Sequence, residues 1–177
     1  TGQVNEIGVS LYQEMLKKTI NSLKLDKNDS DYSKFKENWS PVIRIPVTAR
    51  IPENYIKDSA LRLSFYRRLS NFESQMQLES LLAELIDRFG KIPKDVINLA
   101  NILKIKEKCK SLEIESLEVG TKGITFKFRE GKVENISGLL AFIESDKNNI
   151  KPANEKLFIK TKKGDPLKLP YNILIKM

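Results

Sequence analysis

One helix ends and the next begins within ten residues, Glu84-Leu85-Ile86-Asp87-Arg88-Phe89-Gly90-Lys91-Ile92-Pro93. Before Gly90, apolar residues recur at helical spacing, which predicts an amphipathic helix from about residue 74 to residue 89. Glycine commonly follows the last turn of a helix, and proline is favoured in the first turn of a new one. The run therefore predicts a helix–turn–helix corner, with Leu85, Ile86 and Phe89 in the core.

The outer side of this corner is charged and carries Glu84, Asp87, Arg88 and Lys91. Glu84 and Arg88 stand four residues apart, so they can form an ion pair within the helix, worth about 0.2–0.5 kcal/mol. From the pattern alone, this face is either a solvated helix exterior or a surface that binds a partner.

Two further helices flank this one. Asp58 or Ser59 can cap the earlier helix, in which Leu61, Phe65, Tyr66 and Leu69 should face inward. The later helix opens at Pro93 and should bury Val96, Leu99, Ile102, Leu103, Ile105, Cys109 and Leu112. Before all three, apolar and polar residues alternate over 43–51, which predicts a strand. Pro46 cannot donate to a ladder, so this strand should lie at a sheet edge or be irregular.

Beyond residue 113 the pattern becomes strand-rich. Residues 114–119 and 124–128 predict a hairpin around the turn at 121–123. A short helix is expected over 136–143 and a short strand over 157–159, while 173–175 fits either strand or helix. At the other end, 9–25 predicts an amphipathic helix. A polar linker follows, in which Tyr32, Phe35 and Trp39 could dock on another surface. The expected fold is α+β: an N-terminal helix and linker, an edge strand, three helices, then a small mostly antiparallel sheet with a short helix.

Composition limits the function classes. The chain has 177 residues, which suits one domain with an appendage, and a formal net charge of +8, which suits nucleic acid or an acidic protein surface. The lysines are spread along the chain, and an AT-rich coding sequence would also explain part of this charge. No apolar stretch approaches the roughly 20 residues of a membrane helix, and no secretory signal is visible.

Catalytic motifs are missing from the sequence. There is no histidine, and the single cysteine, Cys109, fits a buried packing thiol, so the ligand count excludes a structural zinc site. No Gly-rich phosphate-binding motif occurs. Glu84 and Asp87 lie side by side rather than across a cleft, so a carboxylate-based enzyme is not expected. Carboxylate-bound magnesium remains formally possible.

A second candidate surface is a group of arginines: Arg44, Arg50, Arg62, Arg67 and Arg68. Arginine forms fork-like hydrogen bonds to phosphate or carboxylate, and Tyr55 and Tyr66 lie nearby in sequence. These arginines could bind a nucleic-acid backbone, or they could pair with carboxylates of their own domain.

Three segments resemble the C-terminal domain of bacterial transcription-repair coupling factors. They are Ile51-Pro52-Glu53-Asn54-Tyr55-Ile56, Leu61-Arg62-Leu63-Ser64-Phe65-Tyr66-Arg67-Arg68-Leu69 and the opening run 84–93. Residues 8–16 resemble the helix that leads from the motor of such proteins into this domain. The resemblance implies a connecting helix at 1–26, a linker at 27–40 and the C-terminal α+β domain at 41–177, with a diverged tail over 146–177. Beyond Val133 the resemblance is weak.

The resemblance implies a cytoplasmic parent that translocates on double-stranded DNA by ATP hydrolysis, displaces stalled RNA polymerase and recruits UvrA. ATP and magnesium would belong to the parent's motor, and no cofactor is expected in this chain. The domain itself would be a monomeric, non-catalytic regulator that packs on the parent's N-terminal UvrA-binding module and restrains the motor. Glu84, Asp87, Arg88 and Lys91 are the expected interface. The alternative is a basic DNA-binding accessory module.

Overall fold

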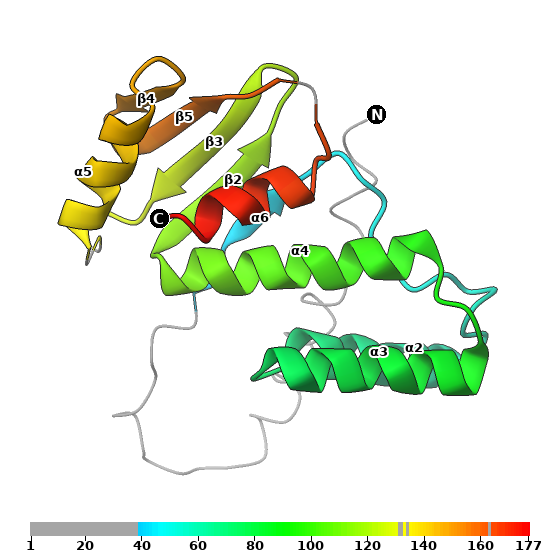
Figure 1. Cartoon of the computed structure of the whole chain (residues 1–177). Helices are drawn as coiled ribbons and strands as arrows, with labels where there is room; N and C mark the ends of the chain where they lie inside the picture. The colour runs from blue at the N-terminus through cyan, green and yellow to red at the C-terminus, as the bar shows by residue number, and fades with distance from the viewer. Residues whose placement is uncertain (1–38, 131–132, 134, 163) are drawn as a thin grey trace, which may run out of the picture.

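The computed structural model describes residues 39–177 except 131–132, 134 and 163 (Figure 1). The helix expected over 9–25 and nearly all of the linker lie outside these residues. Within them the order of elements is β1 (Val42–Arg44), α2 (Ser59–Ser70), α3 (Gln75–Phe89), α4 (Lys94–Ser111), β2 (Ile114–Val119), β3 (Gly123–Phe128), α5 (Ile136–Ser145), β4 (Ile150–Ala153), β5 (Lys156–Lys160) and α6 (Lys168–Leu174). The expected α+β class is confirmed.

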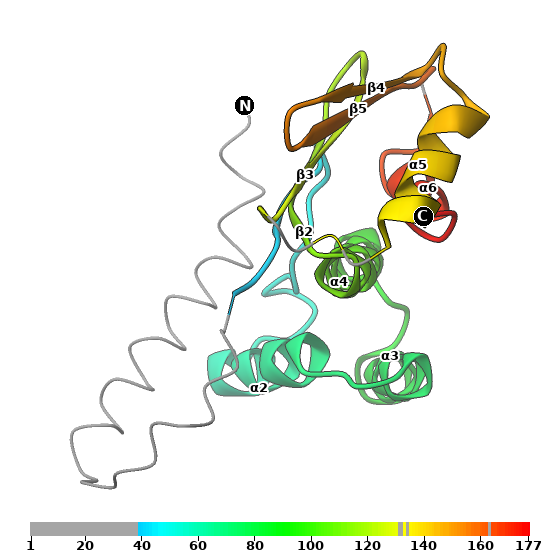
Figure 2. The same cartoon turned by 90° about the vertical axis from the view of Figure 1, so that its left-hand side faces the viewer.

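The strands form one sheet in the order β1-β2-β3-β5-β4. β1 pairs in parallel with β2, and the other neighbours are antiparallel. Figure 2 views the sheet nearly edge-on, with α4, α5 and α6 on one side of it and α2 and α3 beyond α4. The described residues therefore form a sheet with a helical layer on one face, and the α2–α3 pair packs against α4.

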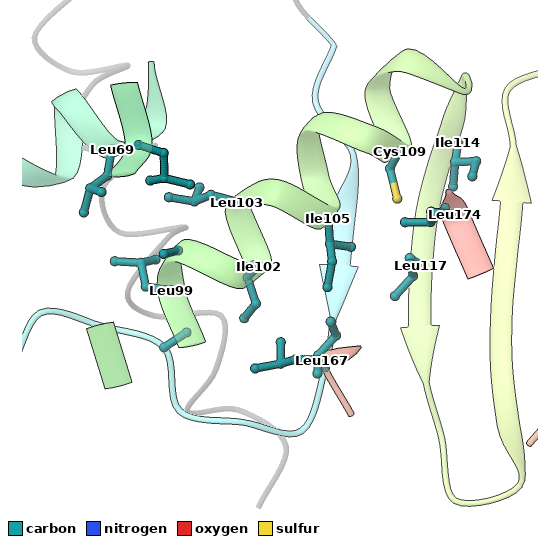
Figure 3. Close-up of a cluster of buried hydrophobic side chains, with 14 of the residues drawn as sticks. Leu69, Leu99, Ile102, Leu103, Ile105, Cys109, Ile114, Leu117, Leu167 and Leu174 are labelled. Carbon is teal, nitrogen blue, oxygen red and sulfur yellow. The ribbon is translucent and has the colours of Figure 1, made fainter. Parts of the chain in front are cut away.

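α4 is the central element because it packs on both neighbouring layers. It buries eight residues around much of its circumference, including Leu99, Leu103, Ile105 and Cys109. In the close-up of the core, Leu103 lies near Leu69 of α2, while Ile105 and Cys109 face the sheet and α6 (Figure 3). Burial raises the pKa of the Cys109 thiol to about 12. The predicted packing role of Cys109 agrees with this position.

The edge strand is shorter than expected. Only Val42–Arg44 pair with the sheet, because Pro46 has no N–H to donate and the Val47 N–H turns back to the Ile45 carbonyl at 2.8 Å. The alternation nevertheless continues, since Ile45, Ala49 and Ile51 are buried. The buried Asn98 of α4 holds this extended segment by donating to the Thr48 carbonyl at 2.9 Å.

The tail contains elements that the sequence left open or did not predict. β4 was not predicted, and its four residues pair with β5 as an edge strand. The segment that fitted either strand or helix is helical: α6 covers Lys168–Leu174 and buries Ile173 and Leu174 against the core. None of the helices in the described part of the chain is long and apolar enough to span a membrane.

Candidate functional site

The helix–turn–helix corner joins α3 to α4 through Gly90, and α2 packs beside α3. We keep the name helical corner for this turn together with the adjoining surface of α2 and α3. The Asp58 side chain accepts from the Leu61 N–H at 2.7 Å and caps α2, and Ser74 caps α3 in the same way through Gln77. α3 ends at Phe89, and Gly90 adopts a φ of +83°, a conformation that glycine reaches without the penalty of a side chain. The predicted end of this helix at Gly90 is thus confirmed.

Aromatic rings hold the end of α3 in place. The Tyr55 hydroxyl donates to the carbonyls of Leu85 and Gly90, at 3.0 and 3.1 Å. Its ring meets that of Phe89 edge-on at 5.8 Å, and Phe89 meets the fully buried Phe65 of α2 at 5.7 Å. These contacts join α2 and α3 to the turn that carries Tyr55, so the last turn of α3 is held in a defined position.

Two arginines and one glutamate form a cluster on this aromatic base. Arg68 of α2 donates to both carboxylate oxygens of Glu84, with Nη1 to Oε1 at 2.9 Å and Nη2 to Oε2. Arg88 donates to the same Oε1 at 2.9 Å, which is the ion pair expected from the spacing. Both guanidinium groups also lie over the Phe65 ring, at 5.1 and 5.4 Å from its centroid.

The pKa of Glu84 reflects this environment. The hydrogen bond from Arg68 is the largest cause, Arg88 adds to it, and together they outweigh partial desolvation and lower the pKa of Glu84 to about 2. Glu84 is therefore ionised throughout the physiological range. The cluster of Arg68, Glu84 and Arg88 has a net charge of +1, and its side chains are held by hydrogen bonds and stacking.

The other predicted interface residues lie beside this cluster but not in it. Asp87 and Lys91 are exposed, and neither makes an ion pair with the described residues. The predicted core position of Ile86 is wrong: its side chain is 53% exposed, whereas that of Leu85 is fully buried. Successive helical residues lie about 100° apart, so Ile86 falls beyond the edge of the buried stripe. The corner thus presents an exposed apolar residue next to Asp87.

A groove lies between α2 and α3 next to the cluster. Its volume is about 560 Å³, and Arg67, Arg68, Met76, Ser80 and Glu84 are among the residues that line it. The Met76 side chain is 77% exposed. Residues 75–77 form the first turn of α3, in agreement with the helix predicted from about residue 74. The corner therefore combines fixed charges, free polar groups and two exposed apolar side chains.

The five arginines that were predicted as a possible basic surface have different partners in the structure. Arg44 lies on β1, and Arg50 pairs with Asp95 of α4 at 3.4 Å. Arg62 donates to the Ile56 carbonyl at 2.8 Å and lies 3.7 Å from Glu53. Arg68 is held by Glu84, and Arg67 is exposed at the groove. Most of these arginines thus bind acceptors of their own domain.

The contact between Arg68 and Glu84 was not predicted, because it joins the two surfaces that the sequence left separate. Sixteen residues separate the pair, and no local spacing rule reaches across two helices. Of the three linker aromatics, Trp39 does dock, since the Arg129 guanidinium lies 4.4 Å from its ring centroid, while Tyr32 and Phe35 lie outside the described residues. No group of three or more His, Cys, Asp or Glu residues in the described parts of the chain is arranged to hold a metal ion.

Comparison with known sequences gives the family of this chain, and comparison with solved structures gives a matching fold. A family model described as the TRCF domain matches residues 45–139. The transcription-repair-coupling factor of Rickettsia bellii (strain RML369-C) is 37% identical over 177 residues, which is 99% of this chain and 15% of that protein. The one from Escherichia coli (strain K12) is 31% identical over 144 residues, 81% of this chain and 12% of that protein.

The fold also matches a solved structure. The crystal structure of the C-terminal domain of a transcription-repair coupling factor superposes with a TM-score of 0.66 at 19% sequence identity, covering 78% of this chain and 89% of that one. The chain spans only a small part of the length of the curated relatives that it matches. On these matches, the chain belongs to the transcription-repair-coupling factor family and contains its TRCF domain.

Proposed function

We propose that this chain is the C-terminal regulatory domain of a longer, cytoplasmic transcription-repair-coupling factor and catalyses no reaction itself. In the proposal, the ATP-driven DNA translocase and the RNA polymerase contacts belong to the rest of the protein. This domain acts as a single copy and packs on the N-terminal UvrA-binding module of the same protein. While it is packed there, UvrA is excluded and the motor is restrained.

The observation that carries this proposal is the preorganised cluster of Arg68, Glu84 and Arg88. Long charged side chains usually lose rotamer freedom when they bind, at about 0.5–1.5 kcal/mol each. Here hydrogen bonds and the Phe65 ring already restrict them. A partner can therefore dock on these charges at a smaller entropic cost than on free surface side chains.

The neighbouring residues complete a surface suited to reversible binding. Asp87 and Lys91 offer one charge of each sign, and the exposed Ile86 and Met76 offer apolar contacts beside the groove. Contacts between exposed charges weaken as salt rises, and competing partners can displace them. A regulatory contact must be released when the motor is needed, so modest affinity fits the role.

The direct test is binding between the 177-residue chain and the separately purified N-terminal module, measured by calorimetry at low and high salt. We expect weak binding that falls as salt rises. Asp87→Lys should weaken it at least tenfold without destabilising the domain, because Asp87 makes no ion pair among the described residues. Glu107→Lys on α4 introduces the same change of charge at an exposed site outside the corner and should leave binding unchanged.

The same substitution tests the regulatory consequence in the full-length protein. Asp87→Lys should increase both UvrA capture and DNA-stimulated ATP turnover, because the restraint is weakened. Unchanged binding to the module would show that Asp87 lies on a solvated face. If Asp87→Lys weakens binding to the module as expected but leaves ATP turnover and UvrA capture unchanged, the contact exists but does not regulate the motor.

A further inference from the structure

The sheet has a face that none of the described helices covers. In Figure 2, α4, α5 and α6 all lie on one side of the sheet. The side chains directed to those helices are buried, among them Ile124, Phe126, Leu157 and Ile159. Side chains alternate along a strand, so the intervening residues of β3, β5 and β4 point to the opposite, open face.

On that open face the strand register gathers lysines around one aromatic residue. Lys156, Phe158 and Lys160 follow one another at alternate positions of β5. Lys151 of β4 stands directly opposite Phe158, and Lys127 of β3 stands directly opposite Lys156. We call this surface the lysine face, defined by Lys127, Lys151, Lys156 and Lys160 around Phe158.

Gly123 allows Phe158 to lie close to the sheet. A Cβ atom at Gly123 would be 2.8 Å from Cζ of Phe158 and 2.2 Å from the Ile159 carbonyl oxygen, so only glycine leaves room for the tip of the ring. The ring is half-buried and thus held against the sheet, with part of its surface still exposed. An aromatic ring fixed in this way can stack with a planar group without further ordering.

The charges on this face are largely uncompensated within the domain. Lys151, Lys156 and Lys160 are exposed and make no ion pair with the described residues, whereas Lys127 pairs with Glu115 at 3.1 Å. Like charges directly opposite each other across a sheet are destabilising, as Lys127 and Lys156 are here. Glu118 of β2 lies two strands from Phe158 in the same cross-strand row, and Glu155 lies in the β4–β5 turn. The part of the face formed by β4 and β5 therefore carries positive charge that is not neutralised by the described residues.

We propose that the lysine face binds single-stranded nucleic acid, with a base stacked on Phe158 and the flanking phosphates on the lysines. An open sheet that carries an aromatic ring amid cations is suited to this ligand, because every base has a π-face and every linkage an anionic phosphate. Residues four apart on a strand stand roughly 13 Å apart, so Lys156 and Lys160 lie on either side of a base stacked on the ring. This surface is separate from the helical corner, and its function does not depend on the proposed regulatory contact.

The test is fluorescence anisotropy of the 177-residue chain with labelled twenty-nucleotide oligo-dT, oligo-U and a duplex of equal length, at several salt concentrations. We expect both single strands, or one of them, to bind more tightly than the duplex. With three or four phosphates neutralised, the logarithm of the binding constant should fall with the logarithm of salt at a slope of about −2 to −3. Comparison of oligo-dT with oligo-U shows whether the lysine face prefers DNA or RNA.

Substitutions separate stacking from charge. Phe158→Leu keeps an apolar side chain over Gly123 but removes the aromatic ring, and it should weaken single-strand binding about tenfold. Phe158→Tyr should restore binding. The double variant Lys156→Ala/Lys160→Ala should reduce the salt slope by about 1.4, while the control double variant Lys57→Ala/Lys94→Ala removes the same charge elsewhere and should bind normally.

Several results would overturn the proposal. Normal binding by Phe158→Leu would exclude base stacking on this residue. A duplex that binds as tightly as single strands, or equal losses in the two double lysine variants, would indicate general attraction to a basic protein instead. Thermal unfolding of each variant shows whether the domain remains folded, and the tyrosine variant supports the assignment if the leucine variant is unstable.

Discussion

The helical corner and the lysine face are both charged surfaces, but they differ in how their charges are satisfied. At the corner, Glu84 binds two arginines that also lie over Phe65, so the charges are neutralised in part and held in place. On the sheet, three of the four lysines make no ion pair with the described residues. The corner is a rigid surface of mixed charge, whereas the sheet face is a cationic surface with one fixed ring.

Residue types alone would favour the arginines, rather than the lysines, as the surface that binds nucleic acid. Arginines near aromatic residues are a common nucleic-acid signal, yet here most of them bind acceptors within the domain. The lysines are dispersed in sequence, but pairing of β3, β4 and β5 brings four of them together. The sheet thus gathers more unpaired positive charge on one surface than the corner does, where two of the arginines share Glu84.

The largest expected effect concerns the apolar support of the corner. Leu85→Ala should destabilise the chain by roughly 2–5 kcal/mol, because it leaves a cavity in the core beneath α3. The neighbouring Ile86→Ala should change stability by no more than about 0.5 kcal/mol, because that side chain is exposed. Urea unfolding of both variants measures the difference. Similar losses for the two would mean that Ile86 is packed and that the corner presents no apolar contact.

The next effect concerns the support of the lysine face. Gly123→Ala should cost about 1–3 kcal/mol, because the added methyl group overlaps the Ile159 carbonyl and the Phe158 ring. Gly120→Ala, at the other end of the same turn, is the control, since its nearest neighbour would lie 3.6 Å away. Thermal unfolding compares the two. A stable Gly123→Ala variant would show that β3 and β5 are not as close as described.

The smallest effect concerns the charges of the corner. Glu84→Gln should cost at most about 1 kcal/mol at pH 7, because the partners of Glu84 are partly exposed and screened by solvent. The pKa of Glu84 is lowered on folding from 4.5 to about 2, so its contribution is complete above about pH 4.5. The contribution decreases as the pH falls and is lost near pH 2.

Urea unfolding from pH 7 down to pH 2 follows this contribution. The stability difference between the wild-type chain and Glu84→Gln should narrow below pH 4.5. Glu107→Gln, which removes an exposed carboxylate from α4, is the matched control for the loss of one negative charge. A constant difference for Glu84→Gln would mean that its hydrogen-bonding shape, rather than its charge, supports the corner.

The α+β class, the three central helices and the hairpin follow from the sequence, because local periodicity and helix-end residues reflect backbone geometry. Gly90 ends α3 since it reaches a positive φ, and residues 114–128 alternate because a sheet has two faces. The same local rules predicted the pair between Glu84 and Arg88. They could not show that Ile86 lies outside the buried stripe, since that depends on where α2 and α4 pack.

The sequence by itself thus determined the kind of most elements, the ends of the central helices and the likeness to a family, but not β4 or the helical state of α6. Only the tertiary structure decided which charges are neutralised and which are free. Arg68 reaches Glu84 because α2 lies beside α3, and Lys127 joins Lys151 and Lys156 because β3, β5 and β4 are adjacent. Such contacts join residues far apart in the chain. Their electrostatics depend on distances in space, which no spacing along the sequence determines.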